Sequence, residues 1–239
     1  MMQVHIGTSG WVYPYWRGRF YPEDLAEPDW LGFYARYFSS VEINRSFYRL
    51  PTKAVFAHWR DATPAGFVFS VKAGRFISHM KKLKAPESTL PPLLDAVAGL
   101  GDKLGPLLFQ LPPNWRVNPE RLRAFLEALP RGLRVAFELR DTSWHNDAVL
   151  ALLAEHNAAF CIYDLAGFES PRLISADFTY LRLHGPGAAY SGRYGRRALE
   201  AWAAWLARQP VDTAYVYFDN DEAAYAVRDA AELQKLLSG

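Results

Sequence analysis

The 239-residue chain has little of three features that would place it in a specialised class of protein. Its single cysteine, Cys161, cannot form an internal disulfide, so a disulfide-stapled secreted fold is excluded. No segment approaches the roughly 18 consecutive apolar residues of a membrane-spanning helix. The net charge is only +2, which does not indicate a bulk electrostatic attraction to nucleic acid or to a membrane surface.

The first residues also lack a basic region followed by an apolar stretch, so they do not resemble a signal peptide. We therefore expect a cytoplasmic protein with no membrane partner, and the oligomeric state stays open. No low-complexity linker or shift in composition divides the chain, which predicts one domain over residues 1–239.

Aromatic residues are abundant in the chain, at 15% of the total. Such rings build cores, but they also line sites that bind flat ligands or sugars. Tyr13, Trp16, Tyr48 and Trp144 follow predicted strands, so they are expected in loops at one end of the fold. They are candidates for substrate binding; the alternative is that they pack these loops onto the rim.

Eight short apolar or alternating segments predict strands, at residues 4–9, 40–44, 67–73, 106–111, 134–140, 159–164, 179–184 and 213–219. Helical patterns separate most of them, at 52–61, 86–100, 119–129, 146–156, 197–208 and 222–237. This alternation predicts a parallel sheet, and the dinucleotide-binding glycine pattern is absent after the first strand. We expect an α/β fold, a single (β/α)8 TIM-type barrel, with an irregular or missing helix at 165–178, between the sixth and seventh strands.

Period-two alternation then predicts which side chains enter the barrel. In the fifth strand, Phe137 and Leu139 would face the helices, while Glu138 and Arg140 would face the lumen. The corresponding residues of the second to fifth and seventh strands, together with Asp164 and Asp219 at the ends of the sixth and eighth, predict a polar ring at the C-terminal mouth, where active sites of this fold lie: Glu42, Asn44, Lys72, Gln110, Glu138, Arg140, Asp164, Arg182, His184 and Asp219. Its nearly balanced charges could persist ionised when buried.

Within this ring, Glu42 and Glu138 are the leading candidates for acid/base catalysis, with Lys72 and His184 as further catalytic candidates. Lys72 sits where a Schiff-base lysine could lie, but such a lysine needs a lowered pKa. With several carboxylates nearby we expect its pKa to rise, which favours an ion pair or a substrate-charge role. The alternative for each carboxylate is a structural ion pair.

Two further sites are weaker predictions. His184 and the surrounding carboxylates could hold a divalent metal ion such as magnesium or manganese, the one cofactor considered. The glycine-rich, basic loop after the seventh strand, with Arg193 and Tyr194, could bind phosphate at a helix N-terminus. Its alternative is a solvated loop. Asn220, beside Asp219, is a further candidate for substrate binding.

Short motifs spread over nearly the whole chain resemble a known family. They include Ile6-Gly7-Thr8-Ser9-Gly10-Trp11, Val41-Glu42-Ile43-Asn44, Phe69-Ser70-Val71-Lys72-Ala73, Phe137-Glu138-Leu139-Arg140, Leu181-Arg182-Leu183-His184-Gly185 and Tyr217-Phe218-Asp219-Asn220. The chain resembles the family catalogued as domain of unknown function seventy-two. The resemblance implies a TIM barrel and implies no activity, because the family has no established one.

From the residues, we expect an enzyme that carries out acid/base chemistry on a polyhydroxylated or phosphate-bearing small molecule at the barrel mouth. One alternative is a metal-dependent phosphodiesterase or nucleic-acid-binding protein resembling the endonuclease IV class. The other is a non-catalytic module that binds a ligand at the same aromatic mouth.

Overall fold

The computed structural model describes residues 2–238 of the chain. Within them, eight parallel strands form a nearly closed barrel with the neighbour order β1-β9-β8-β6-β5-β4-β3-β2. The strands are β1 (Gln3–Thr8), β2 (Ser40–Ile43), β3 (Val68–Lys72), β4 (Leu104–Leu111), β5 (Val135–Leu139), β6 (Ala159–Leu165), β8 (Phe178–Leu183) and β9 (Thr213–Phe218). The predicted TIM-type barrel is therefore confirmed.

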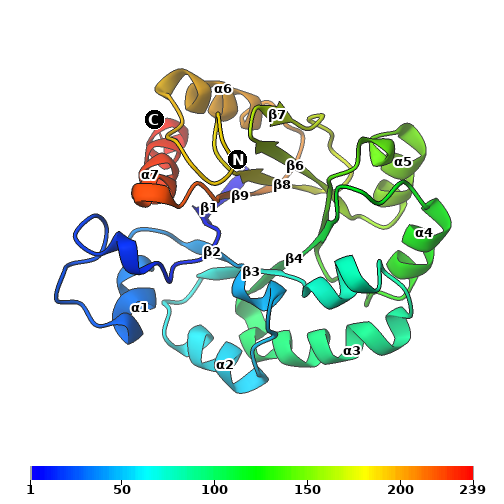
Figure 1. The fold of residues 1–239 in the computed structure, drawn as a ribbon, viewed down its shortest axis with the longest axis horizontal. Coiled ribbons are helices and arrows are strands. Elements are labelled where there is room, and N and C mark those ends of the chain that lie inside the picture. Colours follow the sequence, from blue (N-terminus) through cyan, green and yellow to red (C-terminus); the bar gives the residue numbers. More distant parts are fainter. Residues whose placement is uncertain (1, 239) are drawn as a thin grey trace.

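Helices surround the strands as an outer ring (Figure 1). They are α1 (Trp30–Tyr34), α2 (Lys53–Asp61), α3 (Pro86–Val97), α4 (Pro119–Glu127), α5 (Asp147–Glu155), α6 (Arg196–Leu206) and α7 (Tyr225–Ser238). Between β6 and β8, residues 166–177 form no helix, and a two-residue antiparallel strand, β7 (Phe168–Glu169), pairs with β6 instead. This confirms the irregular connection. No helix in residues 2–238 has the length and apolar character needed to cross a membrane.

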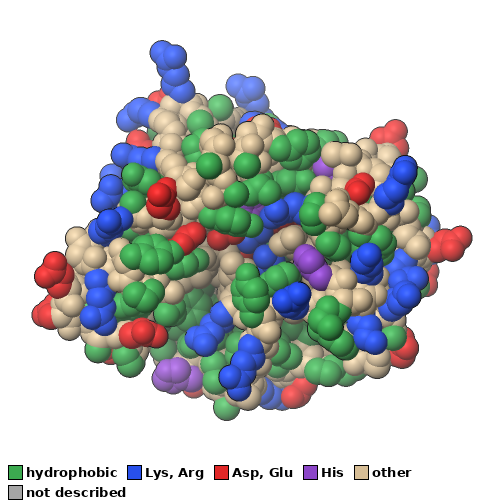
Figure 2. All heavy atoms as spheres, viewed as in Figure 1, with side chains coloured by type: hydrophobic (Ala, Val, Ile, Leu, Met, Phe, Trp, Pro, Cys, Tyr) green, Lys and Arg blue, Asp and Glu red, His purple; other side chains and the backbone are tan. Residues whose placement is uncertain are grey.

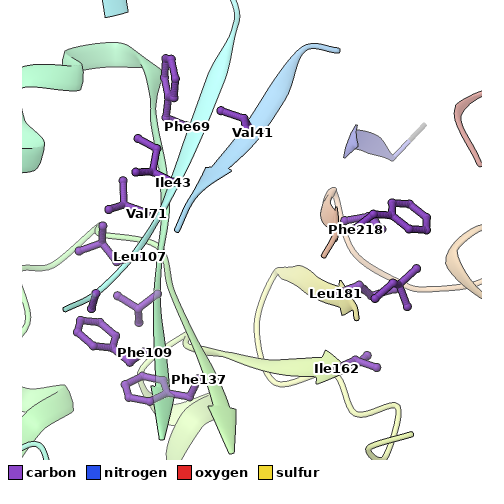
Figure 3. Close-up of a cluster of buried hydrophobic side chains, with 14 of the residues drawn as sticks. Val41, Ile43, Phe69, Val71, Leu107, Phe109, Phe137, Ile162, Leu181 and Phe218 are labelled. Carbon is purple, nitrogen blue, oxygen red and sulfur yellow. The ribbon is translucent and has the colours of Figure 1, made fainter. Parts of the chain in front are cut away.

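The alternation of strand side chains divides the interior into two parts. Val41, Phe69, Phe109 and Leu181 point away from the barrel axis into the layer between strands and helices (Figure 3). The lumen holds a second apolar set of Leu108, Ala136, Ala159, Cys161, Phe178, Tyr180, Tyr215 and Tyr217. These side chains fill the barrel, so a ligand can approach only from its ends.

The junction between β1 and β2 closes the barrel in an unusual way. A single parallel bridge joins Ser9 to Glu42, in place of a continuous ladder. Next to this bridge, the Tyr34 hydroxyl accepts a hydrogen bond from the Thr8 amide (2.9 Å) and donates one to the Ser40 carbonyl (3.1 Å). A side chain thus replaces part of the backbone pairing at this junction.

Gly7 makes this close approach possible. A Cβ atom at position 7 would lie 2.0 Å from the Ser40 carbonyl oxygen and 2.8 Å from the Tyr34 hydroxyl. No other residue fits between the two strands without moving them.

Candidate functional site

Arg182, on β8, is the centre of the polar cluster at the barrel mouth. Its side chain is fully buried, and its guanidinium contacts three carboxylates: Glu42 (2.8 Å), Glu138 (2.7 Å) and Asp219 (3.1 Å). Three buried anions around one buried cation would be unstable if any of them lost its partner. The structure thus brings four of the residues in the predicted ring together, with Arg182 at their centre and Glu42, Glu138 and Asp219 around it.

Glu42, near the C-terminal end of β2, accepts several hydrogen bonds on each of its two carboxylate oxygens. Both carboxylate oxygens accept from Arg182. In addition, the Ser9 hydroxyl donates to Oε1 (2.6 Å) and the Tyr180 hydroxyl donates to Oε2 (2.7 Å). This carboxylate is held in place and has no exposed surface.

Glu138, on β5, lies between two arginines. Arg182 donates to one of its oxygens at 2.7 Å, and Arg140 forms an ion pair with the other. Burial opposes ionisation of Glu138, but the charges of Arg140 and Arg182 favour it, and the pKa of Glu138 lies well below the ordinary value. Glu138 is therefore a carboxylate anion at neutral pH.

His184, directly after β8, is oriented from both sides. Arg182 (3.1 Å) and Arg140 (3.3 Å) approach its Nε2 atom, and guanidinium groups can only donate hydrogen bonds. Nε2 must therefore accept, and Nδ1 carries the proton that it donates to Asp219 Oδ2 at 2.9 Å. Burial opposes ionisation of Asp219, but His184 and Arg182 still lower its pKa.

Lys72, the last residue of β3, differs from every other charged residue of the cluster. It is 7% exposed, yet no carboxylate in residues 2–238 lies within salt-bridge distance of its amine. The Nζ atom instead lies over the Phe47 ring, 4.4 Å from its centroid. Burial and the charge of Arg182 lower the pKa of Lys72 to about 8, against the weaker opposing effect of the carboxylates. The expected rise in the pKa of Lys72 and its expected ion pair are wrong, because Arg140 and Arg182 contact the carboxylates. A substrate-charge role for Lys72 stays a prediction.

Three further predicted residues lie beside this cluster. Gln110, at the end of β4, is 8% exposed. Asn44 follows β2 and has a buried Oδ1 atom without a partner in the described chain. The Tyr13 hydroxyl donates to the Ser9 carbonyl, and burial followed by the charges of Asp219 and Asp221 raises its pKa well above the ordinary value. On one face of the molecule, acidic, basic and histidine side chains lie close together near the centre, bordered by hydrophobic ones (Figure 2).

Other predicted residues form a separate group that fastens the loop after β8. Asp229, on α7, accepts from the Tyr194 amide (2.9 Å), from Asn220 Nδ2 (2.8 Å) and from Arg193 Nε (3.3 Å). The Tyr194 hydroxyl donates to Asp164 at 2.9 Å. The structure thus places Arg193, Tyr194, Asn220 and Asp164 outside the Arg182 cluster, and phosphate binding by this loop stays a prediction.

The predicted aromatic residues also fall into two groups, one buried and one exposed. Trp16 and Trp144 are fully buried, and their indole nitrogens donate to the carbonyls of Asp221 (2.9 Å) and Trp115 (2.6 Å). They pack loops onto the rim, which is the alternative considered above. Tyr48, by contrast, is 76% exposed.

Several residues near the cluster have no counterpart in the sequence prediction. Ser9 and Tyr180 both bind Glu42, and Tyr180 could have been found by extending the alternation of Arg182 and His184 back by two residues. Tyr163 packs against Arg140, with the guanidinium 5.3 Å from its ring centroid. His79 lies against Phe47, and burial together with Lys72 and Arg75 lowers its pKa.

No group of three or more His, Cys, Asp or Glu side chains within residues 2–238 is placed to hold a metal ion. The carboxylates of Glu42 and Glu138 are also poorly placed as metal ligands, because their oxygens point at guanidinium groups. The geometry therefore offers no support to the metal-dependent alternative.

Comparison with known proteins decides the family. The model of the family described as "Protein of unknown function DUF72" matches residues 5–239. The chain belongs to this family. A solved structure of a DUF72 family protein from Thermotoga maritima is 26% identical, with a TM-score of 0.89 over 99% of this chain and 100% of that one. A DUF72 family protein from Enterococcus faecalis, at 21% identity, has the same fold, with a TM-score of 0.82 over 100% of this chain and 99% of that one.

Two curated relatives carry no assigned activity in their names. The UPF0759 protein YecE of Escherichia coli is 31% identical over 140 residues, which is 57% of this chain and 48% of YecE. The chain thus spans about half the length of YecE in this match. The UPF0759 protein YunF of Bacillus subtilis is 23% identical over 98% of this chain and 94% of its own length. A function must therefore be argued from the site.

Proposed function

We propose that this DUF72 protein is an enzyme that carries out acid/base chemistry on a small polyhydroxylated or phosphate-bearing substrate at the barrel mouth, with Lys72 as the general base. One observation carries the proposal. Lys72 is a buried amine with no anionic partner among residues 2–238, next to a cluster in which the carboxylates are already paired.

The surroundings of Lys72 suit a base better than those of Glu42 or Glu138. A general base works best when its pKa lies near the working pH, and the pKa of Lys72 is lowered to about 8. Glu42 and Glu138 each accept hydrogen bonds from buried guanidinium groups, so neither has a free oxygen ready to take a proton. Their role in this proposal is to hold Arg182 and Arg140.

Neighbouring side chains supply binding groups. The Arg140 side chain is 11% exposed at the mouth and can donate a charge-assisted hydrogen bond to a phosphate or carboxylate. Gln110 and Asn44 add amide groups suited to hydroxyls, and the buried Asn44 Oδ1 atom has no partner within the described residues. An anionic substrate with hydroxyl groups fits this set.

The test monitors proton exchange directly. The protein is incubated in D2O with a panel of sugar phosphates and hydroxy acids, and NMR follows deuterium entering C–H positions. We expect exchange in at least one compound. Lys72→Met should reduce it by about 10²–10⁴-fold, the usual contribution of general acid–base catalysis.

Two variants make the test specific. Lys72→Arg keeps a positive charge but cannot act as a base near neutral pH, so it should be as inactive as Lys72→Met. Lys53→Met removes an exposed lysine paired with Asp95 and should leave exchange unchanged. Retained exchange in Lys72→Arg would show that Lys72 supplies only charge and would refute its role as base.

A further inference from the structure

A cavity of about 600 Å³ lies beside the mouth, between the segments that follow β2 and β3 and the first turns of α3. Its volume is that of a typical pocket for a small molecule. Phe47, Tyr48, Phe76, Met80 and Leu93 are among the residues that line it, so its walls are largely apolar.

Large apolar side chains around the cavity remain open to solvent. Tyr48, Phe76 and Met80 are all exposed, and all three line the same cavity. A concentration of exposed aromatic and methionine side chains around a hollow is typical of a ligand site. Aromatic walls favour a flat ring as the occupant.

The polar groups of the cavity point to an anion. Arg75 lines it, and the Arg75 guanidinium forms no ion pair in the described chain. Thr89, which is 5% exposed, also lines it, and its buried hydroxyl has no hydrogen-bond partner within residues 2–238. The two lining segments, 45–50 and 74–93, carry six basic residues against the single acidic residue Glu87. A negative ligand would be attracted to this surface.

The cavity also adjoins the amine of Lys72. Phe47 lines the cavity and its ring lies 4.4 Å from Lys72 Nζ. Ser46, another lining residue, donates from its hydroxyl to the Lys72 carbonyl at 2.6 Å. A ligand in the cavity is therefore separated from the candidate base by one aromatic ring.

We infer that this cavity binds a planar apolar ring that carries an anionic group, and that this ring belongs to the substrate handled at Lys72. The inference deepens the proposed function and rests on it. It narrows the substrate from a small polyhydroxylated or phosphate-bearing molecule to one that also has a flat apolar part.

The binding test needs no turnover and uses anilinonaphthalene sulfonate, a fluorescent probe with flat rings and one anionic group. We expect saturable binding to the folded protein with one site per chain. Phenylnaphthylamine, which lacks the sulfonate, should bind about tenfold more weakly, as expected for one lost charge-assisted contact. The variant Arg75→Gln should weaken the sulfonate probe by a similar factor and leave the neutral probe unchanged.

A second variant locates the site. Ser88 is exposed and lines the cavity from the first turn of α3, so Ser88→Trp fills the space without entering the core. It should weaken binding at least about tenfold, a loss of about 1.4 kcal/mol. The matched variant Ser88→Ala should leave binding within about twofold. Unfolding curves establish that each variant is folded.

The outcomes separate this inference from the proposed function. Absent or non-saturable binding, or full binding by Ser88→Trp, would overturn the cavity as a site. Equal affinity for both probes would overturn its preference for an anion. If binding holds but Lys72→Met retains exchange activity, the base assignment fails, and with it the claim that the ring belongs to a substrate handled at Lys72.

Discussion

Replacing Arg182 by methionine should destabilise the protein strongly at neutral pH. The change leaves Glu42, Glu138 and Asp219 as buried carboxylates without their shared cation. Removing one partner from a buried ion pair typically costs about 3–5 kcal/mol. For a chain of this size each kcal/mol shifts the Tm by about 2–4 °C, so the loss is roughly 6–20 °C.

The effect should also depend on pH in a defined direction. In the natural protein, the charges around Glu138 and Asp219 hold their pKa values below the ordinary ones, so their contribution to stability is lost as pH falls. In Arg182→Met that support is gone and burial raises the same pKa values. The difference in unfolding free energy between the two proteins should therefore shrink as pH falls from 8 to about 4, which is close to the ordinary carboxylate pKa values.

Urea unfolding of both proteins at several pH values measures this difference. The matched control is Arg123→Met, which removes an exposed arginine paired with Glu155 at 3.1 Å. Such exposed pairs contribute about 0–1 kcal/mol, with little dependence on pH. A loss in Arg182→Met no larger than in this control, or one that does not change with pH, would refute the view of Arg182 as the charge that holds the cluster together.

Three further predictions concern single side chains. Tyr34→Phe removes the hydroxyl between Thr8 and Ser40, and urea unfolding should show a loss of about 1–3 kcal/mol; an unchanged midpoint would contradict the bridging role. Lys103→Met, measured the same way, should cost a similar amount, about 1–3 kcal/mol, because the amine donates to the Arg60 carbonyl in the last turn of α2 and to the carbonyl and hydroxyl of Thr63 just beyond it. Lys72→Met should stabilise the protein at pH 7 by an amount on the order of 3 kcal/mol, because the folded state lowers the Lys72 pKa from 10.5 to about 8. That gain should shrink as pH rises from 8 to 10.5, where only the unfolded natural protein still binds the proton, and a constant gain would contradict the lowered pKa.

Alternation along strands predicted much of the site because it is a local property. It correctly placed Glu42, Glu138 and Arg182 inside the barrel, on different strands far apart in sequence. Applied strictly, it also excludes Asp164, since Cys161 faces the lumen and position 164 has the opposite parity. Assigning Asp164 by its place at the strand end, in place of its parity, put it in the wrong group.

Pairing between charges could not be read from the sequence in the same way. A list of nearby carboxylates predicts a raised pKa for Lys72, but the outcome depends on which cation each carboxylate contacts. Arg182 contacts three of them, and the Lys72 amine has no carboxylate within salt-bridge distance in the part of the chain that the structure describes.

The cavity beside Phe47 could not be predicted from the sequence either. It depends on a turn of π-helix at Phe76–Met80 and on left-handed backbone at Lys82, Leu83 and Ala85. In sequence this segment reads only as a basic stretch before a helix.

The side-chain link between β1 and β2 has a consequence for the motions of the barrel. A strand held to its neighbour by one backbone bridge and a few side-chain hydrogen bonds separates at lower cost than one held by a full ladder. We expect this junction to be the first part of the barrel to open in native-state hydrogen exchange. Ser9 and Glu42 face each other across it, so such breathing would expose the carboxylates around Arg182 to water. The rigidity of the site would then depend on the junction between β1 and β2, where the pairing of the barrel strands is least continuous.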